Sequence, residues 1–172
     1  MKRRIALIII LFIVLVAAGI IRFYKNLSPE IKPTDLVIES TIQKLDDDLF
    51  IIEMQVNRKA DDNYSNFVYP LVSGLGNISF IEEDNLYSPS SVGDDSESHE
   101  LLLNNFTFKQ LNYDLNGFSI PSNKGIYKMK FTLRKFDDFQ EIKDPHIYYI
   151  HKEKRFGKTL NWIEKFDVEI LE

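Results

Sequence analysis

Several acidic clusters are the first candidates for chemistry, because calcium prefers carboxylate ligands. A helix–loop–helix calcium loop places oxygen ligands at positions 1, 3 and 5 and a glycine at position 6. Counted from Asp61, position 6 holds Asn66, and counted from Asp94 it holds His99. Neither stretch matches. The acidic run at 46–48 is better interpreted as a solvated turn, with loose calcium binding as the alternative.

Zinc or nucleophilic chemistry would need histidines, cysteines or an activated serine. His146 and His151 are five residues apart, so on one strand they face opposite sides and cannot chelate together, and the third histidine, His99, lies in an acidic stretch. The chain has no cysteine, and it contains neither a G-x-S-x-G elbow nor a phosphate loop ending in G-K-[ST]. We therefore expect no enzyme activity, no metal site and no cofactor.

Two adjacent aromatic residues, Tyr148 and Tyr149, are candidate binding residues. On a strand one of the two would face outward, where a tyrosine can stack on a sugar or anchor a protein interface. Ordinary packing inside a β-sandwich is the alternative.

These residues must be positioned by strands, because a period of two dominates the chain beyond residue 34. Two alternating runs joined by the turn near 46–48 predict a hairpin. The apolar face of its first strand carries Leu36, Ile38 and Ile42, and that of its second strand carries Phe50, Ile52, Met54 and Val56. Further strands are predicted at 77–83, 100–113, 125–136, 146–154 and 159–170. The run at 100–113 would place Leu102 on its inner face, and Asn116-Gly117 is typical of a hairpin turn. Polar loops are expected at 58–66 and 87–100. The fold class is therefore an all-β antiparallel sandwich.

The N-terminal segment has a different character. Residues 5–21 carry no charge, follow Lys2, Arg3 and Arg4, and precede Arg22 and Lys25. Seventeen apolar residues with flanking aromatics are just long enough to span a bilayer. The heavier basic cluster favours a cytoplasmic N-terminus and an exported remainder. We expect an uncleaved signal-anchor at 1–25, a spacer at 26–34 and an extracytoplasmic domain at 35–172; a cleaved signal peptide is the alternative.

The charge of the exported part is strongly negative. Five of the 21 basic residues and none of the 26 acidic ones lie in the first 25 positions, which leaves 16 against 26 and a formal charge of −10. Such a domain is repelled by nucleic acid and by anionic lipid head groups, and it favours a basic partner. Export without cysteine indicates a bacterial envelope protein, periplasmic or at the cell surface, held at the cytoplasmic membrane.

The stretch "IPSNKGIYKMKFTLRKF" resembles a pattern near the C-terminus of immunoglobulin-like bacterial envelope domains, in which a turn leads to G-x-Y, an alternating strand and a long final strand. Gly125 and Tyr127 hold the G-x-Y places, and "WIEKFDVEI" would be the final strand. Membrane-tethered proteins of this kind include immunity proteins, which block a secreted toxin. The resemblance implies an immunoglobulin-like sandwich that binds another protein.

We therefore expect a membrane-tethered, extracytoplasmic protein-binding domain, an immunity or envelope assembly factor; the alternative is a carbohydrate- or cell-wall-binding module. The candidate partner-binding residues are Asp46, Asp47, Asp48, Asp94, Asp95, Glu97, Glu100, Tyr148 and Tyr149.

Overall fold

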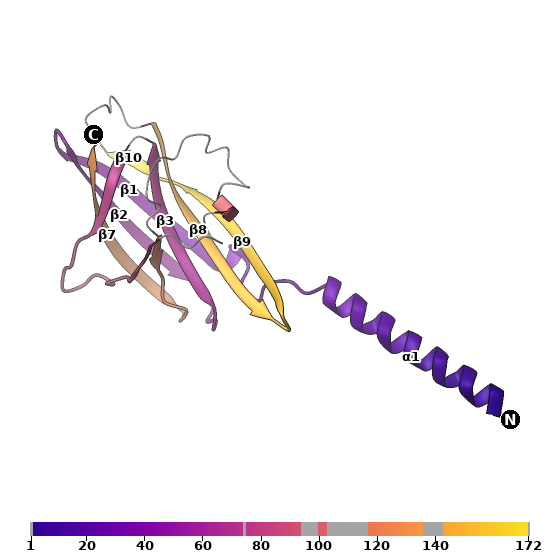
Figure 1. The fold of residues 1–172 in the computed structure, drawn as a ribbon. Helices are drawn as coiled ribbons and strands as arrows, with labels where there is room; N and C mark the ends of the chain where they lie inside the picture. The colour runs from indigo at the N-terminus through magenta and orange to yellow at the C-terminus, as the bar shows by residue number, and fades with distance from the viewer. Residues whose placement is uncertain (1, 74, 94–99, 103–116, 136–142, 172) are drawn as a thin grey trace.

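The computed structural model describes residues 2–73, 75–93, 100–102, 117–135 and 143–171. Its N-terminal helix α1 (Lys2–Lys25) projects away from a β-sandwich (Figure 1). The segment Leu7–Lys25 is long and apolar enough to cross a membrane, with none of its residues buried against the rest of the protein. Twenty-four helical residues extend roughly 36 Å, enough for a hydrocarbon core of about 30 Å.

A short extended linker and a 3-10 turn, η1 (Pro33–Asp35), lead into the first sheet. That sheet has the strand order β10-β1-β2-β7-β4. Its strands are β1 (Leu36–Asp46), β2 (Leu49–Arg58), β4 (Leu75–Phe80), β7 (Gly125–Lys135) and β10 (Glu169–Leu171).

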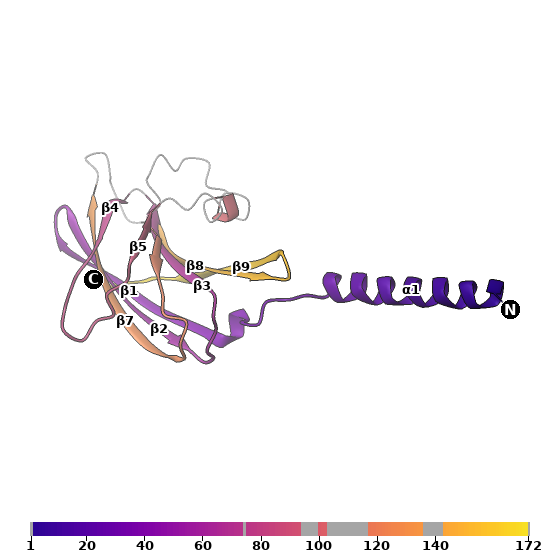
Figure 2. The ribbon, with the colours of Figure 1, turned by 60° about the horizontal axis from the view of Figure 1, so that its bottom comes forward.

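The second sheet has the order β5-β6-β3-β8-β9. It consists of β3 (Ser65–Ser73), β5 (Ser91–Gly93), β6 (Gly117–Ser119), β8 (Lys143–Arg155) and β9 (Lys158–Asp167). Figure 2 shows the two layers from a second direction. The series β1, β2, β7, β4 and β3, β8, β9 correspond to strands A, B, E, D and C, F, G of an immunoglobulin domain.

The predicted hairpin and the predicted inner faces are confirmed. β1 pairs antiparallel with β2, with Ile38 opposite Val56 and Ile42 opposite Ile52. The alternate residues of both strands are buried, because one face of each strand must leave water. β7 adds Met129, Phe131 and Leu133 to the same core. The second sheet supplies Val68, Phe118, Ile147 and Tyr149, and Ile120 and Val168, which directly follow β6 and β9, complete it.

Three local predictions are wrong. Of the predicted strand at 100–113 the structure describes residues 100–102; these are helical, and Leu102 packs on the outer face of the second sheet rather than in the main core, while 103–113 lie outside the described residues. Gly117 begins strand β6, and a Cβ there would lie 2.4 Å from the Tyr69 ring, so glycine is needed for close packing and not for a turn. The predicted final strand breaks at Val168: β9 belongs to the second sheet, whereas β10 pairs in parallel with β1 and leaves Ile170 exposed.

Candidate functional site

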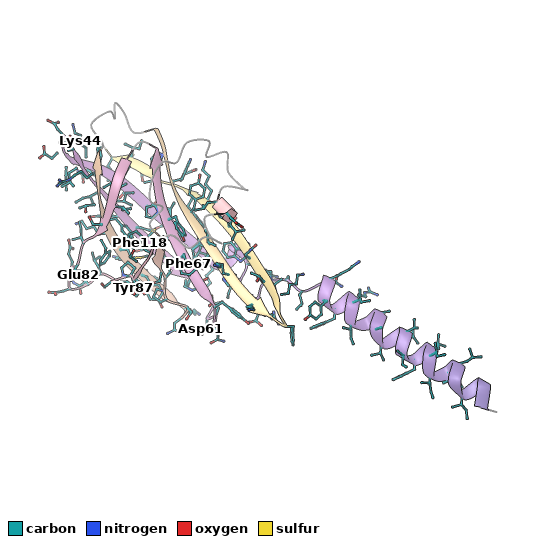
Figure 3. All side chains as sticks on the ribbon, viewed as in Figure 1. Lys44, Asp61, Phe67, Glu82, Tyr87 and Phe118 are labelled. Carbon is teal, nitrogen blue, oxygen red and sulfur yellow. The ribbon has the colours of Figure 1, made fainter. Side chains whose placement is uncertain are left out.

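The acidic turn between β1 and β2 lies at the end of the sandwich farthest from α1. Lys44, labelled in Figure 3, marks that end, and the 11-residue strand β1 leads there from the linker, a distance of roughly 35 Å. Asp46, Asp47 and Asp48 are all exposed. Lys44 offsets part of this charge, with its Nζ 2.9 Å from the Asp47 carboxylate.

An exposed leucine accompanies these carboxylates. Leu45 is 56% exposed, and Leu171 on the neighbouring strand β10 is 40% exposed. Leu171 pairs with Gln43, two residues before Leu45, and a β-bulge between Lys44 and Asp46 follows this pair. We call residues 44–48 the distal tip. It presents an apolar side chain surrounded by acids, a combination that fits a protein surface carrying basic residues around an apolar pocket.

The other predicted site residues that the structure describes, Glu100, Tyr148 and Tyr149, lie away from the distal tip. Asp94, Asp95 and Glu97 lie outside the described residues. Glu100 is exposed at the start of the helical segment 100–102, whose leucines pack against the outer face of the second sheet.

Tyr148 and Tyr149 are both buried, at 4% and 0% exposure, so the expectation that one of them faces solvent is wrong. Tyr148 packs with Tyr69, Ile150 and Leu102 on the outer face of the second sheet. Tyr149 points into the space between the sheets. Strand β8 is covered on both faces because segment 100–102 lies over the side that would otherwise meet water. A stacking platform for sugars is therefore not available at these two tyrosines.

Around Tyr149 lies a buried polar network that the sequence did not reveal. It begins with the guanidinium of Arg58, which donates to the Tyr149 hydroxyl at 2.9 Å and to the carboxylate of Asp62. Tyr149 donates to Asn66 Oδ1 at 2.6 Å, and His151 Nδ1 lies 2.8 Å from the same oxygen. The stretch 58–66, expected to be a polar loop, thus contributes its residues 58, 62 and 66 to the interior.

The network continues toward the linker. His151 Nε2 lies 3.4 Å from the Glu153 carboxylate, which also accepts the backbone N–H of Glu30 at 2.9 Å and faces Arg155 at 3.2 Å. Arg155 in turn lies 3.3 Å from the Glu30 carboxylate. The linker is therefore bonded to the domain through charged groups and is not a free spacer.

Trp162 fixes the same region from β9. Its indole stacks on the rings of Tyr149 and His151, with centroids 5.0 and 5.6 Å away, and its N–H donates to the carbonyl of Ile31 at 2.8 Å. This tryptophan serves packing and linker attachment, which leaves it poorly placed for stacking on an external ligand.

Burial determines the charge states in the network. It raises the pKa of the Tyr149 hydroxyl, because a phenolate would be desolvated there. It also lowers the pKa of His151 despite the neighbouring Glu153 carboxylate, so the imidazole is neutral near pH 7. A neutral histidine with both ring nitrogens facing protein groups and no exposed surface has no access to a substrate. We conclude that the network is structural.

The outer face of the first sheet carries a pocket that is lined in part by charged side chains. A shallow pocket of about 310 Å³ lies over β1, β2 and β7, beside the loop that follows β4. Lys130 lies between Glu53 and Glu83, at 3.2 and 3.4 Å, and these two hydrogen bonds raise its pKa. Within the described ranges no group of three or more histidine or acidic side chains is arranged to hold a metal ion. Asp61, the first residue of one stretch that was compared with a calcium loop, accepts the backbone N–H of Lys124 at 2.5 Å.

Comparison with known proteins gives no independent assignment. No protein-family model matches the chain, and no curated protein matches it at a significant level.

Proposed function

We propose that the chain is a single-pass membrane protein whose β-sandwich binds another protein outside the cytoplasm, through the distal tip. The observation that carries the proposal is the position of this tip: an exposed leucine among three exposed aspartates, at the end opposite the helix. A partner with basic side chains around an apolar pocket has the complementary chemistry. An immunity or envelope assembly factor would act in this way.

The orientation in the membrane belongs to the same proposal. Lys2, Arg3 and Arg4 precede the apolar run, and their charge favours retention in the cytoplasm. The sandwich, with a formal charge of −10 beyond residue 25, is then extracytoplasmic. The carbohydrate-binding alternative is not carried forward, because the tyrosines that motivated it are buried.

A site-specific crosslinking experiment tests the proposal. The full chain is expressed in its own membrane with a photo-crosslinking residue at Leu45, and, as a control, at Ile126, which is 60% exposed on β7. We expect one protein crosslinked from position 45 and absent from position 126. Crosslinking of the same set of proteins from both positions would contradict a specific site.

Charge variants then test the electrostatic part. The triple variant Asp46→Asn, Asp47→Asn, Asp48→Asn removes three charges from the distal tip, and Glu82→Gln, Glu83→Gln, Asp84→Asn removes three from another exposed loop. We expect the first variant to slow association about tenfold or more at low salt and the second to have little effect. Equal effects of both triple variants would mean that only net charge matters.

A further inference from the structure

The tip of the β8–β9 hairpin has an unusual residue. Phe156 is 63% exposed, and its φ of +49° makes it the one non-glycine with positive φ among the described residues. It is followed by Gly157 at φ +76°. Two-residue turns with positive φ at both positions favour asparagine or aspartate followed by glycine. A bulky aromatic side chain here is unfavourable both for the backbone and for solvation, which points to a function for the ring.

The end of helix α1 lies against this tip. The Phe23 ring meets the Phe156 ring edge to face, with centroids 5.6 Å apart. The Tyr24 hydroxyl donates to the Phe156 carbonyl, and Lys158 Nζ donates to the Tyr24 carbonyl at 3.3 Å. Figure 1 shows β8 and β9 reaching toward the C-terminal end of the helix, where the chain enters the linker. Phe156 is therefore level with the point where the apolar run of the helix ends and the membrane interface would begin.

Between the helix end and the domain lies a solvent-open cavity of about 420 Å³. Arg22 and Arg155 line it, together with the polar residues Asn26 and Ser28. The Arg155 guanidinium also faces the carboxylates of Glu30 and Glu153, so Arg22 supplies most of the uncompensated charge at the cavity. Lys25, Lys154 and Lys158 add further positive charge nearby in the sequence. This concentration of cations contrasts with a domain that is acidic as a whole.

We propose that this junction binds anionic phospholipid of the membrane that α1 crosses. The Phe156 ring enters the interfacial layer, and a lipid phosphate occupies the cavity beside Arg22, with Arg155, which is already paired with Glu30 and Glu153, at the opposite wall. Aromatic rings favour the headgroup level of a bilayer. Guanidinium groups pair well with phosphate oxygens, and basic residues beside a span attract anionic lipid. The inference depends on the proposed membrane anchoring but not on the proposed protein partner.

Fluorescence quenching tests the position of the ring. Because the chain has no cysteine, Phe156→Cys and Leu45→Cys each give one labelling site for an environment-sensitive dye. The full chain is reconstituted in phosphatidylcholine vesicles, with and without phosphatidylglycerol, that contain a lipid spin-labelled just below the headgroup. We expect strong quenching at position 156 and none at position 45, which lies at the far end of the sandwich.

Lipid co-purification tests the phosphate site. Phosphatidylglycerol retained by the detergent-purified chain is compared among wild type, Arg22→Gln and Arg134→Gln, the last removing a charge from an exposed site on β7. We expect roughly a fivefold loss of retained lipid for Arg22→Gln and no change for Arg134→Gln. Excess inorganic phosphate should not displace the lipid, and displacement would overturn the assignment to lipid.

The outcomes separate the two proposals. If the chain is stripped from vesicles by alkaline carbonate, the proposed membrane span fails. If the chain stays embedded but position 156 is no more quenched than position 45, the span stands and the inferred lipid contact is overturned. Equal lipid retention by the two arginine variants would overturn the phosphate site alone.

Discussion

The sharpest stability prediction concerns Asp62, whose carboxylate is surrounded by donors. It accepts from the Arg58 guanidinium, from the Asn66 amide at 3.1 and 3.2 Å, and from the backbone N–H of Tyr64 at 2.7 Å. Asp62→Asn keeps the volume but replaces one of these oxygens with an NH₂ group. Whichever way the new amide is turned, a donor faces a donor, and the Arg58 charge loses its counter-ion.

The expected loss of stability in Asp62→Asn follows from the burial of the ion pair. The side chains of Arg58 and Asp62 are 1% and 0% exposed, so water cannot replace the lost partner. Removing one partner of a buried ion pair costs about 3–5 kcal/mol of stability, because the other charge is left buried and unpaired. Because domains are stable by only about 5–15 kcal/mol, we expect Asp62→Asn to remove a fifth or more of the free energy of unfolding.

Urea unfolding of residues 26–172 measures this loss, since the hydrophobic core contains no side chain of α1. Trp162 fluorescence is the probe, because the indole stacks on two members of the network. Asp61→Asn is the matched control: the same change at the preceding residue, which is exposed, should cost less than about 1 kcal/mol.

Equal losses for Asp62→Asn and Asp61→Asn would refute the reasoning. A second test is the pair Arg58→Met with Asp62→Leu, which removes both charges. We expect the double variant to be more stable than Asp62→Asn, because no unpaired charge is left in the interior. A double variant as unstable as the sum of its single changes would mean that the charges do not act as a pair.

Three further predictions follow from other contacts. Burial lowers the pKa of His151, so this imidazole takes up a proton at higher pH in the unfolded chain than in the folded one. The stability that the neutral His151 contributes is therefore present above about pH 6.5 and is lost as the pH falls further. His151→Gln should reduce the dependence of the unfolding free energy on pH between pH 7 and 5, and an unchanged dependence would contradict this. Gly117→Ala forces a Cβ against the Tyr69 ring and should cost about 1–3 kcal/mol in urea unfolding, whereas a neutral result would mean that the ring moves freely. Phe156→Asn relieves an unfavourable backbone angle and should stabilise residues 26–172 in solution by about 1 kcal/mol, while lowering the membrane quenching of a dye attached at Lys158→Cys; a loss of stability in solution would argue against strain at this turn.

The sequence predicts the hairpin of β1 and β2, and the inner face of β7, because alternation along a strand is a local property. Phe131 and Ile52, for example, could be assigned to the core without any knowledge of their neighbours. The same reasoning fails for strand β8, because both of its faces are buried. Residues 145–151 are all buried, and whether Tyr148 meets water is decided by the distant segment that contains Leu102.

The network was missed for a related reason. Arg58, Asp62 and Asn66 look like loop residues because their partners, Tyr149 and His151, are supplied by a strand more than 80 positions away. The one local signal is their regular spacing of four. The acidic run at 46–48 was recognised because a short turn between two alternating runs has to be at the end of a hairpin.

The attachment of the linker has a mechanical consequence. The Glu30 N–H and the Ile31 carbonyl are bonded to side chains of β8 and β9, respectively, so a pull on the sandwich away from the bilayer first loads these two hydrogen bonds and the Arg155 ion pairs. The force then enters β1, which is hydrogen-bonded to β2 over nearly its whole length, from Leu36 to Asp46. Load applied along such a ladder is shared among many hydrogen bonds in shear rather than breaking them one at a time. The contacts of Glu30 and Ile31 and the β1–β2 ladder would therefore resist a force applied between α1 and residues 44–48.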